Sequence, residues 1–125
     1  MKKTLLLLVI LLVTASAVFA EYDSDTVLEV MRANPSHINT AAEAADSGDF
    51  FTAAKEFMAI AEGMDSIKHF EPYRGSKADW DANIEAVVAT AFQAIGASGM
   101  KDTDKVHEYI NELWALNKKG HGDNK

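Results

Sequence analysis

Apolar residues recur every three or four positions along four separate stretches of the chain, and this spacing constrains the fold more than any other feature. It places the apolar side chains of each stretch on one face of a helix. The stretches cover about residues 25–45, 49–67, 77–97 and 103–117. No alternating stretch is long enough to predict a strand. The pattern therefore predicts an all-α protein, an antiparallel up-down-up-down four-helix bundle.

The spacing also predicts which side chains each helix buries. Many of them are alanines, which let helices approach closely and leave room at one end of a bundle for a large ligand. The expected buried residues are Val27, Val30, Met31, Ile38, Ala41, Ala42 and Ala45; then Phe50, Ala54, Phe57, Met58, Ala61, Met64 and Ile67; then Trp80, Ile84, Val87, Val88, Ala91 and Ile95; and last Val106, Ile110, Leu113 and Leu116 or Asn117.

Glycines and prolines divide the four stretches. Pro35 predicts either a kink or the first residue of a second helical piece, since proline disfavours a helical conformation in the residue before it. Gly48 closes the first helix. Residues 68–77 form the longest connection, which we expect to pack across one end of the domain. Gly96 and Gly99, with Ser98 between them, are expected to end the third helix.

The first twenty residues have the organisation of a secretory signal peptide. Lys2 and Lys3 precede the apolar run 5–13, and small residues lead to Ala20. This predicts cleavage after Ala20, a periplasmic location, and one domain over residues 21–125. An uncleaved membrane anchor is the alternative, but the apolar run is short for one.

The charge and the cysteine count exclude several classes of function. Loss of Lys2 and Lys3 with the leader leaves 10 basic against 19 acidic residues, a net charge of about −9. Such an acidic chain has no electrostatic footprint for nucleic acid, and we expect no membrane association after cleavage. Because the chain has no cysteine, it forms no disulfide, no thiolate metal site and no covalent haem c.

The last helix ends in the pentad Asn117-Lys118-Lys119-Gly120-His121. Its spacing is that of the haem-attachment motif C-x-x-C-H, with Asn117 and Gly120 in place of the two thiols and His121 in place of the iron ligand. A simpler interpretation is an ordinary helix end, in which Gly120 stops the helix and the basic side chains suit the negative end of its dipole.

The order of these features resembles cytochrome c′ and its relative, the soluble b-type four-helix cytochrome of the periplasm. The resemblance covers essentially the whole mature chain. The shared parts are a methionine early in the first helix, a Gly-Asp-Phe turn, a proline-containing loop leading to a tryptophan, a later phenylalanine, and the final pentad. Here they are Met31, Gly48–Phe50, Pro72, Trp80, Phe92 and Asn117–His121.

The resemblance implies a non-covalent haem b. Its axial ligands would be His121 and Met31, which an antiparallel bundle places at the same end, and the remaining site residues would be Trp80, Phe92, Asn117 and Gly120. The alternative role for Met31 is that of a core methionine. The aromatic residue and the arginine that follow the histidine in the family are absent. Because the arginine neutralises haem propionates, its absence favours a haem-free bundle.

Two functions of different classes follow. The first is a non-catalytic haem protein that transfers electrons with a redox partner protein or binds a small gas. The second is a haem-free bundle that binds another protein or a small apolar ligand, in the form of a homodimer. The chain has no nucleophile elbow, metalloprotease helix motif or glycine-rich phosphate loop, so we do not expect an enzyme.

Other candidate groups carry less weight. Trp80, Phe92, Tyr109 and Trp114 either line a pocket or pack in the core, and an exposed Trp114 would suit a dimer seam. Met31, Met58, Met64 and His69 are a candidate soft copper site. His107 is expected to be solvated beside Asp104 or Asn111. The same solvated role is expected for the acids Glu43, Glu56, Glu62, Glu85, Glu108 and Glu112.

Overall fold

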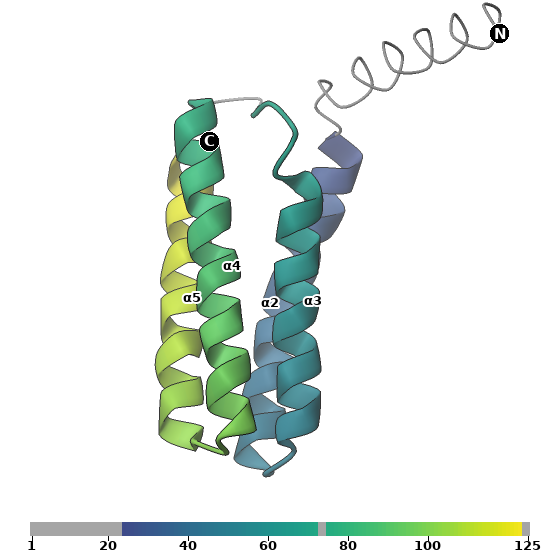
Figure 1. The fold of residues 1–125 in the computed structure, drawn as a ribbon. Coiled ribbons are helices and arrows are strands. Elements are labelled where there is room, and N and C mark those ends of the chain that lie inside the picture. The colour runs from purple at the N-terminus through teal and green to yellow at the C-terminus, as the bar shows by residue number, and fades with distance from the viewer. Residues whose placement is uncertain (1–23, 73–74, 124–125) are drawn as a thin grey trace, which may run out of the picture.

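The computed structural model describes residues 24–72 and 75–123, with side chains up to Lys119. Its helices are α2 (Ser24–Asp46), α3 (Phe50–Ile67), α4 (Lys77–Gly99) and α5 (Thr103–Asp123). They run alternately up and down side by side, which confirms the predicted antiparallel four-helix bundle (Figure 1). The predicted signal peptide over residues 1–20 lies outside the described residues. Among the described helices, none is long and apolar enough to span a bilayer.

The bundle has two distinct ends. The short turns after α2 and after α4 lie together at one, which we call the turn end (Figure 1). The connection between α3 and α4 lies at the other, the loop end, where α2 begins and α5 finishes. Neighbouring helices pack extensively, except that the contact between α2 and α5 is smaller than the other three. This smaller interface distinguishes the α2–α5 seam from the rest of the bundle.

All four helices contribute to a single hydrophobic core. The buried side chains include Val27, Ile38, Ala41 and Ala45 of α2; Ala53, Phe57, Ile60, Ala61, Met64 and Ile67 of α3; Trp80, Ile84, Val87, Ala91 and Ala94 of α4; and Val106, Ile110 and Leu113 of α5. These positions follow the helical spacing, as expected for a bundle that buries one face of each helix.

The buried face of α3 differs from the predicted one. Met58, expected in the core, is 37% exposed, whereas Ala53 and Ile60 are buried. The cause lies in the composition of α3, whose apolar residues cover more than half of its circumference, so the spacing alone fits two neighbouring orientations. Packing against both α2 and α4 selects the orientation centred on Phe57 and Ile60.

Pro35 lies inside α2 and does not start a second helical piece. Proline removes one backbone hydrogen bond from a helix, yet α2 continues on both sides of it. The residue before it, Asn34, is buried, and its side-chain amide donates a hydrogen bond to the Met64 sulfur at 3.3 Å. Contacts with α3 therefore hold this turn of α2 in the bundle despite the local preference against helix.

Two of the glycines predicted to end helices do so: Gly48, with a φ of 77°, follows the end of α2, and α4 ends at Gly99. Gly96 and Gly120 do not, because Gly96 lies inside α4 and α5 continues through Gly120 to Asp123. After α4 the chain reverses at Lys101, whose φ is 55°, a left-handed conformation that costs a non-glycine residue about 1–2 kcal/mol. Asp102 then caps α5 by accepting a hydrogen bond from the Lys105 amide at 3.1 Å.

Asp49 caps the first turn of α3. Its carboxylate accepts hydrogen bonds from the Thr52 amide at 3.1 Å and from the Thr52 hydroxyl at 2.7 Å. The hydroxyl bond and the amide bond, in that order, lower the pKa of the Asp49 carboxyl. The cap is thus formed by the charged carboxylate and weakens when the carboxylate is protonated.

We expect Asp49→Ala to lower the urea midpoint of unfolding at pH 7, and we expect this difference from wild type to shrink in acid. Because folding lowers the pKa, the contribution is complete above the ordinary value of 3.8 and is lost as the pH falls through the lower folded value. Asp49→Asn is the control, since asparagine caps helices without titrating. Urea unfolding followed by circular dichroism measures both, and a loss in Asp49→Ala that does not change with pH would contradict the prediction.

Candidate binding site between α2 and α5

An ion pair at the turn end shows the register of α5 against α2. His107 Nε2 lies 2.6 Å from Asp46 Oδ1, and both side chains are partly exposed. His107 is therefore partly exposed, as expected, but its partner is Asp46 of α2 rather than Asp104 or Asn111. The pair forms because α2 ends where α5 begins, which a single-helix pattern does not reveal.

From this contact, Met31 and His121 fall at the same level of the bundle. Met31 precedes Asp46 by 15 residues, and His121 follows His107 by 14. At 1.5 Å per residue, the two positions lie about 22 and 21 Å from the ion pair toward the loop end. A separation of two heptads also keeps His121 on the α2-facing side of α5. The two positions therefore lie at about the same level of the bundle, on the two helices that form the α2–α5 seam.

Of these two residues, only Met31 has a side chain among the described atoms. Met31 is partly buried and packs against the core from α2. The backbone of His121 belongs to α5, and its side chain lies outside the described part of the chain. The same holds for Gly120, whereas Asn117 is described and partly buried. The predicted residues Met31, Asn117, Gly120 and His121 thus lie on the two helices that form the seam.

Two tryptophans adjoin this end of the bundle. Trp114 stands seven residues from both His107 and His121 on α5, and it is partly buried against the core. It is therefore not the exposed side chain that a dimer seam would require. Trp80 is 4% exposed at the start of α4, and its indole N–H donates to the backbone carbonyls of Ile67 and Lys68, each at 3.3 Å. Trp80 thereby secures the α3–α4 connection.

Phe92 does not belong to this site. Its side chain is 52% exposed, toward the turn-end half of α4. The prediction that Phe92 lines an interior pocket is therefore wrong. The reason is the face of α4 that it occupies: Ala91 and Ala94 point into the core, and Phe92 lies outside them.

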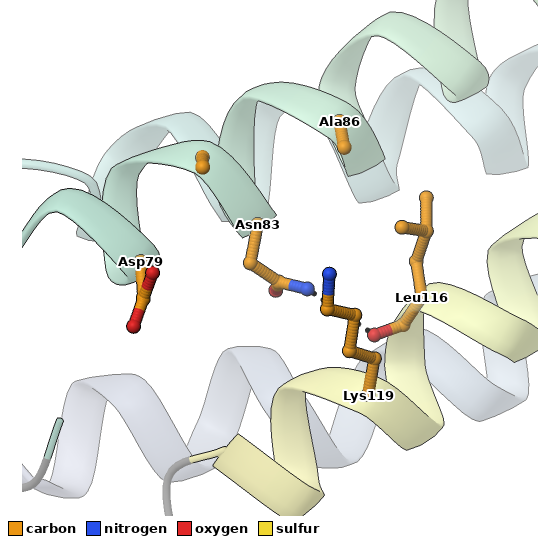
Figure 2. A pocket seen from close by; sticks show the side chains of 6 residues that line it. Asp79, Asn83, Ala86, Leu116 and Lys119 are labelled. Carbon is orange, nitrogen blue, oxygen red and sulfur yellow. Dashed lines mark hydrogen bonds between the residues drawn. The ribbon is translucent and has the colours of Figure 1, made fainter. Parts of the chain in front are cut away.

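A pocket of about 100 Å³ lies between α4 and α5, near the loop end (Figure 2). Asn83 donates a hydrogen bond from its side-chain amide to the Leu116 carbonyl at 3.3 Å. Asp79 and Lys119 line the pocket from opposite helices, together with Ala82 and Ala86. Sequence analysis missed it, because it depends on which residues of α4 and α5 meet. It is well below the roughly 300–1,000 Å³ of drug-sized ligand sites.

A second histidine pair joins α2 to α3. His37 Nδ1 lies 2.5 Å from Glu56 Oε2, and both side chains are mostly buried. Glu56 was expected among the solvated acids, so that prediction is wrong. Glu85 and Glu108 form exposed ion pairs with lysines instead, Lys68–Glu85 at 2.8 Å and Lys105–Glu108 at 3.2 Å. The spacing of a helix predicts its faces but not such contacts across helices.

The candidate copper set is not brought together. Met64 lies in the core as the acceptor of the Asn34 hydrogen bond. Met58 lies on the outer surface of α3, and the His69 ring packs against Phe70. Within the described residues, no group of three or more histidine, aspartate and glutamate side chains is placed to hold a metal ion.

The deep core beneath the seam is already filled, because Val27, Met64 and Trp80 are covered by protein atoms. Met31 is more exposed than these residues. An imidazole with a thioether is a known donor set for haem iron. The comparisons with known proteins do not bear on this site, as no family model, curated protein or solved structure matches the chain.

Proposed function

We propose that this chain binds one b-type haem without covalent attachment at the α2–α5 seam, with Met31 and His121 as axial ligands. The observation that supports the proposal is the register of α5 against α2, which the His107–Asp46 contact shows and from which Met31 and His121 lie at about the same level of the bundle. Because the cysteines of the attachment motif are replaced by Asn117 and Gly120, only coordination and packing would hold the group.

Three further features of the seam support the proposal. The interface between α2 and α5 is the smallest among neighbouring helices, so a haem bound there would displace fewer contacts between helices. α5 stays helical through the pentad to Asp123, which keeps His121 in register with Met31. Lys118 is exposed near the same end, and its ammonium group would serve as a partner for a propionate in place of the missing arginine.

Ligation by both a histidine and a methionine favours electron transfer over gas binding. A haem with these two ligands cycles between its oxidised and reduced forms by one electron, with a raised potential. Binding of a gas would require one of the two ligands to leave. The net charge of about −9 for the mature chain indicates a redox partner with a basic docking surface.

Titration with haemin tests the proposal. The chain from Glu21 to Lys125 is expected to saturate at one haem per chain and to give a sharp Soret band, with split low-spin bands on reduction. Met31→Ala is expected to retain haem but lose the low-spin spectrum, whereas Met100→Ala, at the turn end, is expected to behave as wild type. A broadened free-haem spectrum at micromolar protein would rule the proposal out.

A haem-free bundle that binds another protein remains the second candidate function. It is favoured by a separate observation, the large apolar side chains exposed on α3 and α4. Titration separates the two candidates, since this second function requires no haem spectrum.

A further inference from the structure

Exposed large apolar side chains gather on one side of the bundle. Phe51 is 84% exposed and Met58 37% on α3, Phe92 is 52% exposed on α4, and Met100 is 81% exposed just after α4. Among the described residues, only Leu28 of α2 also belongs to this class. We call the surface that bears these four residues of α3, α4 and the following turn the α3–α4 face.

Helical spacing places these residues on the outside of two neighbouring helices. On α3, the exposed positions Phe51, Lys55, Met58, Glu62 and Asp65 follow one another by four, three, four and three residues. On α4, the same spacing joins Glu85, Ala89, Phe92, Gly96 and Gly99, all exposed. The ion pair of Lys68 with Glu85 bridges the two helices on this side. Two adjacent stripes with heptad spacing form a surface suited to pack against other helices.

Two glycines near the end of α4 leave this part of the face without side chains. Gly96 lies inside the helix, where glycine is less favourable than alanine by about 1 kcal/mol, and Gly99 is the last residue of α4. A Cβ added at either position meets no atom within 4 Å, so both positions are open to the outside. A second backbone has room to approach closely at Gly96, beside Phe92.

Charge is distributed along α3 in a self-complementary way. Lys55 lies in its turn-end half and the acids Glu62 and Asp65 lie toward the loop end, whereas Glu85 of α4 is already paired with Lys68. Lys55 and Glu62 flank Met58, three residues before it and four after it. An antiparallel copy centred on Met58 would therefore set Lys55 of each chain against Glu62 of the other. A parallel copy would set like charges together, which is unfavourable.

We propose that a second copy of this chain covers the α3–α4 face and forms an antiparallel, two-fold symmetric dimer centred on Met58 and Phe92. Helices about 27 and 35 Å long, packed side by side, present a ridged surface of roughly 600 Å² in projection. This corresponds to the lower limit for a stable interface, about 1,200 Å² of accessible surface in total or about 600 Å² per partner. The face lies opposite the α2–α5 seam, so the dimer does not depend on haem.

Charge reversal across the two-fold axis gives the decisive experiment. Sedimentation equilibrium of the chain from Glu21 to Lys125, without haemin and up to about 200 μM, is expected to give a dimer mass. Lys55→Glu and Glu62→Lys should each weaken association by at least about tenfold, because each creates two like-charge contacts per dimer. The double variant, which exchanges the two charges, should restore it. A monomer throughout, or single variants that associate as wild type does, would overturn the proposal.

Gly96→Ala provides a second and independent test. Since the added methyl meets no atom of its own chain, the variant is expected to unfold at a higher urea concentration than wild type when monomeric. It should nevertheless weaken the dimer, as the methyl would hold the second backbone away. Leu28→Ser, on α2, is the matched surface control and should leave association unchanged. A Gly96→Ala variant that associates as tightly as wild type would contradict close packing at this site.

Discussion

Replacement of His121 by alanine is expected to weaken haemin binding by more than about a hundredfold. Loss of a residue that only orients a metal ligand already costs about 10–100-fold, and loss of the ligand itself should cost more. The chain has no thioether attachment to retain the haem after this loss, since it contains no cysteine. Titration of haemin followed at the Soret band measures the change directly.

His107→Ala is the control for this experiment. His107 stands on the same helix two heptads away, and its side chain contacts Asp46. Its removal should leave haemin affinity unchanged and cost less than about 1 kcal/mol of stability, as is usual for a partly exposed ion pair. If both variants lost haem equally, binding would depend on the packing of α5 against α2 rather than on ligation by His121.

The fold could be predicted from the sequence because its main determinant is local. Each helix carries apolar residues at helical spacing, and short turns leave neighbouring helices antiparallel. Helix ends were harder to predict. Gly96 and Gly120 each lie within a helix, since packing outweighs an intrinsic preference of about 1 kcal/mol. The reversal at Lys101 occurs at a residue type that gives no signal for a left-handed conformation.

The candidate site could be predicted only in part, for a related reason. Methionine and histidine at opposite ends of the sequence can be paired by topology alone, which brings the start of α2 and the end of α5 together. The contacts that show how the helices are aligned, His107 with Asp46 and His37 with Glu56, join residues 61 and 19 positions apart. No periodicity within one helix encodes them. The exposure of Phe92 could not be predicted either, because it depends on how α4 is rotated against α3.

The second large effect is expected at the centre of the core, where Phe57→Ala should destabilise the bundle by about 3–5 kcal/mol. Phe57 is fully buried, among the largest side chains that α3 places in the core. Loss of its ring removes buried apolar area and leaves a cavity that helices fixed on both sides cannot fill. Since small domains are stable by only about 5–15 kcal/mol, the thermal midpoint should fall by at least about 12 °C.

Phe51→Ala is the matched control, because it makes the same substitution one and a half turns earlier on the same helix, where the ring is 84% exposed. Its effect on a monomeric sample should stay within about 0.5 kcal/mol, as for other surface changes. Urea unfolding at low micromolar protein keeps the dimer out of the comparison. Equal losses of stability at the two positions would mean that α3 packs in the orientation centred on Met58. Met58 would then be buried, and the α3–α4 face as defined above would not exist. The pair of phenylalanines therefore tests the rotation of α3 on which both the core and the proposed dimer depend.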